Sequence, residues 1–364
     1  MRTGEHDPRA RIFTRLIVAV GLSSWVYVEL PPTRPNVSLD ARELHADALV
    51  WDMTLPIITP GRAERKRDIL SRFVRGGFDV VSMTLAIDIV GTEVALQSFA
   101  NEREFIETNP APCVLVRSAD DIRAAKRDKK LAVGVHFQGT GPFEDDLSSV
   151  SRFYALGVRH ALITYNQRNR AGCGCQTPED TGLTLFGQAI IREMNRVGMI
   201  VDCAHTGFRT SMEAIEASEA PVIASHANIR ALCEHPRCIT DELIRAIAAH
   251  GGVIGITGIG EFLGGGGATP ARLANHIDYV ANLVGPQHVG LGLDHVYDME
   301  TFSEFVRANP AMYPAESQRF DASQLSPEDG PVITDELLRR GYRVREVRGI
   351  LGENWLRVCE AIWK

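Results

Sequence analysis

Short apolar runs alternate along the chain with longer stretches of helical periodicity. Eight runs are bounded by turns or helix caps, and they fall at 48–51, 78–83, 131–135, 160–164, 199–203, 222–224, 252–256 and 288–293. Runs this short and rich in valine and isoleucine are typical of buried strands in a parallel sheet. Between them, the stretches 146–156, 184–196, 240–250 and 269–284 carry apolar residues at helical spacing. Eight strands that alternate with helices predict an α/β protein with a closed (β/α)8 barrel, formed as a single domain by residues 39–364.

An open, doubly wound sheet is the alternative arrangement for this pattern. Such a sheet usually carries a glycine-rich nucleotide-binding turn after its first strand, and none follows Asp52. The glycine run 264–267 is not followed by Lys-Ser or Lys-Thr, so it lacks the phosphate-loop pattern. We interpret it as a flexible loop between a strand and a helix.

Residues 1–38 read as an N-terminal extension that ends in a proline-rich linker, 31–35. Three arginines precede an apolar run at 16–28, which is too short to span a bilayer comfortably. No small-residue cleavage site follows it, so a strand or a helix is favoured over a signal peptide. We therefore expect no stable membrane span and a cytoplasmic protein. Export or membrane association through residues 9–30 is the alternative.

Composition narrows the class of protein and of partner. The 364 residues are 45% hydrophobic and 23% charged, which is ordinary for a globular chain with a large core. The net charge of -7, with no basic block beyond 62–67, excludes nucleic acid as the main partner. The 7 cysteines include no Cys-x-x-Cys pair, which favours free thiols in a reducing compartment.

Chemically active side chains follow the apolar runs, where the carboxyl ends of the strands are expected. They are Asp52 after the first run, His136 and Gln138 on the third, Tyr165 and Asn166 after the fourth, His205 after the fifth, His226 after the sixth and Asp294 after the eighth. Active sites of barrels lie at this end of the strands. Imidazoles and carboxylates are the usual ligands of a catalytic zinc, which lowers the pKa of bound water. In such a site Asp294 would act as general base.

Several of these residues lie within longer motifs. The motifs cover 182–187, 194–199, 202–205, 221–226, 235–237, 240–241, 288–294 and 349–358. In order, spacing and residue type they resemble the renal (membrane) dipeptidase family, the M19 metallopeptidases of the amidohydrolase superfamily. The similarity runs from about Leu49 to the C-terminus. It implies a (β/α)8 barrel that hydrolyses dipeptides or related small amides at a two-zinc site, and it favours a homodimer.

The resemblance also assigns roles to individual residues. His205 and His226 match two histidines that bind one zinc, and Asp294 matches the aspartate that handles the proton of the catalytic water. Arg237 matches an arginine that recognises the substrate carboxylate, a task that suits the planar fork of guanidinium. Asn166 is expected beside the substrate.

Other positions depart from the family pattern. Asp52 and Thr54 stand where the first strand normally supplies histidine and aspartate to the other zinc. Gln138 replaces the bridging glutamate, and a neutral amide does not offset the repulsion between two dications. Tyr165 replaces a substrate-contacting histidine and would stabilise an oxyanion. These changes predict one zinc, or another divalent ion, rather than two. Asp52, His136 or Asp294 would complete the ligands beside the two histidines.

Three functions follow from this sequence. The first is metal-dependent hydrolysis of a dipeptide or a similar small amide that carries a carboxylate. The second is hydrolysis or lysis of a non-peptide amide, an imine or a modified amino acid with one metal or none. The third is a non-catalytic barrel that binds a small ligand. Arg237, Asp294 and the histidine pair together favour an enzyme, because a barrel needs none of them to fold.

Overall fold

The computed structural model describes residues 15–19, 25–29, 37–56, 63–109, 111–144, 146–314 and 323–364. The chain divides into two compact units, Met1–Ser38 and Leu39–Lys364. In the first unit, β1 (Arg15–Ala19) and β2 (Trp25–Glu29) pair as an antiparallel hairpin, so the described parts of the run 16–28 are strands. The proline-rich segment 31–35 lies outside the described residues. No helix in the described ranges is long and apolar enough to cross a membrane.

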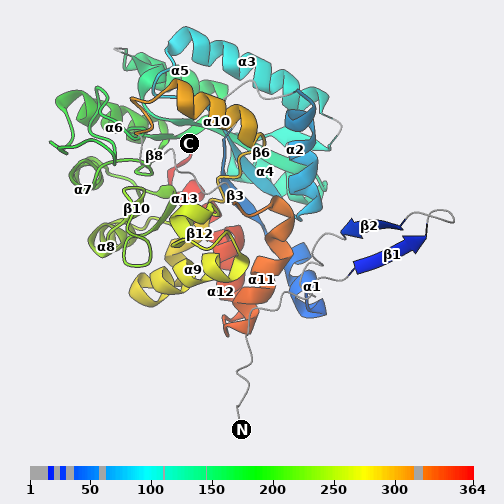
Figure 1. Ribbon diagram of the computed structural model, residues 1–364. Helices are drawn as coiled ribbons and strands as arrows, with labels where there is room; N and C mark the ends of the chain where they lie inside the picture. The colour runs from blue at the N-terminus through cyan, green and yellow to red at the C-terminus, as the bar shows by residue number, and fades with distance from the viewer. Residues whose placement is uncertain are drawn as a thin grey trace. The chain divides into compact units, whose positions relative to one another are not determined.

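The second unit is built on a parallel sheet of eight strands that closes on itself, as the sequence pattern predicts (Figure 1). The strands are β3 (Trp51–Leu55), β4 (Val80–Ile87), β6 (Leu131–Gln138), β7 (Val158–Leu162), β8 (Ile200–Asp202), β9 (Ala224–Ile229), β11 (Ile254–Ile256) and β12 (Val289–Leu291). The circle closes where Asp202 of β8 bridges Ile223, directly before β9, in parallel. Two short strands extend it: β5 (Cys113–Leu115) beside β6 and β10 (Cys238–Ile239) beside β9.

Helices lie around the outside of this sheet (Figure 1). They are α1 (Leu39–Asp47), α2 (Ala63–Arg75), α3 (Thr92–Thr108), α4 (Ala119–Arg127), α5 (Ser148–Leu156), α6 (Leu185–Val197), α7 (Phe208–Ala217), α8 (Asp241–Ala249), α9 (Pro270–Val284), α10 (Met299–Ala308), α11 (Gly330–Arg339), α12 (Val344–Arg348) and α13 (Asn354–Ile362). The four stretches with helical spacing became α5, α6, α8 and α9. Thr184, Thr240 and Thr269 begin α6, α8 and α9, and each side-chain oxygen accepts a backbone N–H of the first turn.

The two ends of the barrel differ in chemistry. At the amino end, the first residues of several strands pack with α13 in one apolar cluster. Trp355 of α13 is fully buried there, and its Nε1 donates to the Leu291 carbonyl at 3.2 Å. A side chain on Gly290 would collide with this indole, so glycine makes the close approach of α13 possible. The amino end is thus a packed floor, and the carboxyl end is left for polar side chains.

Candidate active site

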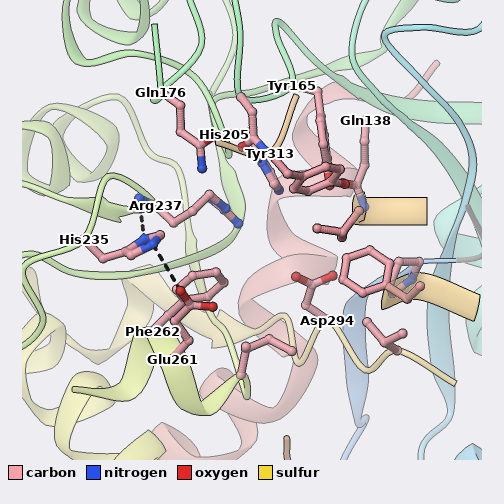
Figure 2. Close-up of a pocket in the computed structure, with 16 residues that line it drawn as sticks. Gln138, Tyr165, Gln176, His205, His235, Arg237, Glu261, Phe262, Asp294 and Tyr313 are labelled. Atoms are coloured by element: carbon pink, nitrogen blue, oxygen red, sulfur yellow. Dashed lines mark hydrogen bonds and ion pairs between the residues drawn. The ribbon is translucent and has the colours of Figure 1, made fainter. Parts of the chain in front are cut away.

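A pocket opens at the carboxyl end of the barrel strands. It encloses about 620 Å³ between the atoms, its open mouth included. The residues that line it are Pro56, Gln138, Tyr165, Asn166, Gln176, His205, His235, Arg237, Ile259, Glu261, Phe262, Asp294, Val296, Phe302, Val306 and Tyr313. Six of the residues singled out from the sequence are among them, contributed by the ends of β6, β7, β8 and β12 and by the turn before β10 (Figure 2).

Three of these six residues have left-handed backbone conformations. The φ angles are 59° for Asn166, 59° for His205 and 58° for Asp294. This region disfavours residues with a Cβ, at a cost of order 1–3 kcal/mol each, and such residues cluster at functional sites. Each of them follows a barrel strand and faces the pocket, which marks the strand ends as a built site.

His205 and His226 meet through their Nε2 atoms, which are 3.0 Å apart. The Nδ1 of His205 is 2.6 Å from the Asn166 amide oxygen, so it donates, and its Nε2 is left as an acceptor. His226 then donates from Nε2, and its Nδ1 accepts from the hydroxyls of Ser225 at 2.7 Å and Thr54 at 3.0 Å. Burial lowers the pKa of both imidazoles well below the usual value, so both rings are neutral.

Asp294 offers a carboxylate without a partner. It is partly exposed to the pocket, and within the described residues no hydrogen bond or ion pair engages it. Loss of solvent raises the pKa of Asp294 to about 6, against the opposing effect of the Arg237 guanidinium. Above that pH the side chain is ionised, and it can take a proton from a group bound in the pocket.

Arg237 is a buried cation with little to neutralise it. The residue is 4% exposed, and its Nη2 donates to the His226 carbonyl at 3.0 Å. The guanidinium carbon lies 5.5 Å from the centre of the Phe262 ring. No carboxylate of the described chain forms an ion pair with it. A buried charge is costly without a counterion, so Arg237 is suited to bind an anionic ligand bidentately.

Tyr165 packs against the histidine pair. Its ring stacks on His205 with centroids 4.2 Å apart, and its hydroxyl lies 2.7 Å from the hydroxyl of Tyr313. Burial raises the pKa of both phenols, so both stay protonated. One hydroxyl donates to the other, and both residues line the pocket.

Asp52 and His136 do not line the pocket, and each has one side-chain atom hydrogen-bonded within the barrel, while Asp52 Oδ2 and His136 Nδ1 are buried with no partner among the described residues. Asp52 is fully buried, and its Oδ1 accepts from the backbone N–H of Thr54 at 3.2 Å and of Leu293 at 2.8 Å. Burial raises the pKa of Asp52 to about 8. The His136 ring stacks on His160 at 4.2 Å, and its Nε2 contacts the Thr84 hydroxyl at 3.0 Å.

The donor set does not fit a two-zinc centre. Gln138 brings a neutral amide, and its Nε2 already donates a hydrogen bond to the Thr84 hydroxyl at 3.0 Å. His205 and His226 present two neutral nitrogens, whereas catalytic zinc takes three protein ligands. In the ranges that the structure describes, no group of three or more His, Cys, Asp or Glu side chains is arranged to hold a metal ion. We therefore assign no chemical step to a metal.

Several lining residues were missed by the sequence analysis. Tyr313 comes from the segment after α10, and no motif marks it. His235 and Glu261 form a pair at the rim, with 3.6 Å between Nε2 and Oε1. His235 lies two residues before Arg237 in one of the motifs, and this proximity is the only feature of the sequence that could have placed His235 at the pocket. His160 does not line the pocket, and its Nδ1 lies 3.2 Å from a carboxylate oxygen of Asp202. In the sequence it falls within the fourth apolar run, which gives no sign of this contact.

The imidazoles, the buried guanidinium and the acid of raised pKa lie at the carboxyl end of a (β/α)8 barrel, which is where enzymes of this architecture carry their active sites. The family model described as Membrane dipeptidase (Peptidase family M19) matches residues 45–306. The chain belongs to this family and is a hydrolase of the dipeptidase type.

Relatives and solved structures agree with this membership. An uncharacterized protein in the pqqA 5' region of Klebsiella pneumoniae is 30% identical over 288 residues, 75% of this chain and 97% of its own. Dipeptidase verJ of Clonostachys rogersoniana is 29% identical over 68% of this chain. An amidohydrolase structure from Pseudomonas aeruginosa is 32% identical with a TM-score of 0.78, covering 89% of this chain and 99% of that one. The match covers only 47–60% of the curated dipeptidases.

Proposed function

We propose that this protein hydrolyses a small amide that carries a free carboxylate, a dipeptide being the simplest such substrate. The observation that carries the proposal is Arg237, a 4% exposed guanidinium with no carboxylate partner in the described chain. It lines the same pocket as Asp294, whose raised pKa suits a base that works near neutral pH. A non-catalytic barrel that binds an anion would need the buried guanidinium of Arg237, but it would not need a carboxyl group of raised pKa beside it.

The reaction can be written with side chains of this pocket. Arg237 holds the substrate carboxylate, and Asp294 takes a proton from a water molecule as its oxygen attacks the amide carbon. The protonated hydroxyl of Tyr165 donates a hydrogen bond to the oxyanion that forms. The C–N bond then breaks, and Asp294 returns the proton to the leaving nitrogen. The products are an amine and a carboxylic acid.

Membership of a metallopeptidase family favours a divalent ion, zinc or another, as a further component. His205 and His226 are the side chains that would contact it, and a bound ion would polarise the amide carbonyl and acidify water. Because the donor set is incomplete, one ion or none is favoured over two. The lack of metal-ligating side chains also favours, as a second candidate, a substrate that water attacks more readily, such as an imine or a strained amide.

Arg237 provides the test. A panel of carboxylate-bearing amides is assayed with wild type, Arg237→Lys and Arg237→Met. We expect Arg237→Met to lower kcat/KM by about 30-fold or more, because truncating a buried charge contact typically costs about 2–5 kcal/mol. The kcat/KM of Arg237→Lys should lie between those of wild type and Arg237→Met, since lysine keeps the positive charge but cannot bind a carboxylate through two N–H groups at once. Absence of turnover of every amide, with and without added divalent metal, would contradict the proposal and favour ligand binding alone.

Metal content is measured on the same samples by plasma mass spectrometry, with a His205→Ala/His226→Ala variant as control. About one ion per chain, lost in the variant, would support the single-ion site. About two would show that other side chains complete a second position.

A further inference from the structure

The pocket has two chemically different sides, and this bears on the substrate class. Figure 2 shows His235, Arg237, Phe262 and Glu261 on one side, and Tyr165, Tyr313 and Gln138 on the other. The Asp294 carboxylate points into the space that both sides share. If Arg237 holds the carboxylate end of the substrate, the acyl end extends toward the tyrosines.

The tyrosine side is uncharged and mostly apolar. Tyr165 and Tyr313 belong to a buried cluster with Val306 of α10, and Phe302 of the same helix packs against it. The rings of Phe302 and Tyr313 are 6.1 Å apart at 83°. Phe302 and Val306 both line the pocket. The two hydroxyls on this side lie 2.7 Å apart and hydrogen-bond to each other, so the wall offers mainly hydrocarbon surface.

On this side, the described residues provide no dedicated counterion for a free ammonium group. Among the lining residues that the structure describes, the carboxylates are Glu261 and Asp294. Glu261 faces His235 at 3.6 Å and lies on the Arg237 side. An ammonium that paired with Asp294 would lower the pKa of that carboxyl and weaken the base. Burying an unpaired charge is strongly unfavourable, whereas burying hydrocarbon is favourable.

We propose that the preferred substrate is an N-acyl amino acid with a neutral, apolar acyl group rather than a dipeptide with a free ammonium group. This inference rests on the proposed function, because it takes Arg237 as the carboxylate site and Asp294 as the base. The apolar wall of Phe302, Val306 and Tyr313 holds the acyl chain, and water cleaves the amide to a fatty or branched acid and an amino acid.

Two substrates that differ only in the α-amino group test this preference for a neutral acyl group. Leu-Gly and 4-methylpentanoyl-glycine share one carbon skeleton, and the second lacks the α-amino group. At pH 7 we expect kcat/KM to be at least about tenfold higher for 4-methylpentanoyl-glycine, the size of effect that one unpaired buried charge readily produces. The gap should narrow above about pH 8, where an α-amino group loses its proton.

A matched pair of variants checks the wall directly. Phe302 is half-buried, so Phe302→Asp and Phe302→Asn are expected to fold, which circular dichroism verifies. Phe302→Asp should reduce or reverse the preference at pH 7, because it supplies a carboxylate for the ammonium group. Phe302→Asn should lower kcat/KM for both probes alike.

The outcomes separate the two proposals. Equal rates, or faster hydrolysis of Leu-Gly by wild type, would overturn the acyl-group inference and leave the proposed function standing. Turnover of neither probe nor of any other carboxylate-bearing amide would overturn both.

Discussion

Single residues at the ends of β7, β8 and β12 have conformations and environments that folding alone does not require. Asn166, His205 and Asp294 are in the left-handed region, and Asp294 has no partner in the described chain. Arg237 is buried beside them with a carbonyl and an aromatic ring as its contacts. A mouth selected only for stability would replace these groups with apolar or paired side chains.

The raised pKa of Asp294 predicts a pH dependence of activity. Because the base must be ionised, kcat/KM should rise with pH through about 6 and then level off. Asp294→Asn should reduce kcat by about a hundredfold or more at pH 7 and above, where Asp294 of wild type is ionised, since general-base catalysis typically contributes that much. A pH profile of wild type from pH 4.5 to 8 measures the transition. A flat profile with active Asp294→Asn would contradict this role.

The stability of the folded protein should respond to pH in the opposite direction to its activity, because ionisation of Asp294 disfavours folding. The pKa of Asp294 is raised in the folded state above its ordinary value of 3.8, so folding favours the protonated form. This contribution is fully present below about pH 4 and is lost as pH rises through about 6. At pH 8 Asp294→Asn should therefore be more stable than wild type by about 3 kcal/mol, and the difference should shrink to well under about 1 kcal/mol at pH 4. Urea denaturation at both pH values provides the comparison.

Among the elements, the floor and the mouth of the barrel are made by different parts of the chain. The floor is α13 packed against the first residues of the strands. The mouth is made by the residues after the strands and by α10, which brings Phe302 and Val306 to the pocket. Function and stability are thus separated along the strand axis, as is usual for this architecture.

This separation predicts a variant that is unstable but active. Trp355→Ala should lower the free energy of unfolding by about 3–5 kcal/mol, the typical cost of removing a fully buried large aromatic side chain. Leu356→Ala, at a partly exposed neighbouring position, is the control and should cost much less. Below the unfolding transition, kcat/KM of Trp355→Ala should stay within about twofold of wild type, because the floor does not contact the pocket. A large loss of activity in folded protein would argue against the separation.

On the scale of the whole molecule, the chain consists of two compact units, and the described residues that line the pocket all belong to Leu39–Lys364. We predict that a chain beginning at residue 39 folds and keeps the kcat and the melting temperature of the full chain. Thermal denaturation and the amide assay compare the two. A melting temperature lower by more than about 5 °C would show that the first unit contributes to folding. A homodimer and a cytoplasmic location stay predictions.

The strands and several helices were accessible from the sequence for a simple reason. Strands that are buried on both faces must be apolar, and their neighbours must be amphipathic, so the alternation is visible in the chain. Threonines at helix starts act locally, and Thr184, Thr240 and Thr269 each cap a helix. The convergence of Gln138, His205 and Asp294 on one pocket follows because all carboxyl ends of a parallel barrel face the same way.

The depth of a side chain within the barrel could not be read in this way. A period of two assigns a residue to a face, but strand register and stagger decide whether it reaches the mouth. Asp52 and His136 therefore lie among interior partners, while Gln138 lines the pocket. The sequence by itself determined the barrel, its polar end and most of the charged groups there, because these depend on local periodicity and strand direction. Only the tertiary structure decided that Tyr313 and α10 form an uncharged wall, because that contact joins segments distant in the chain.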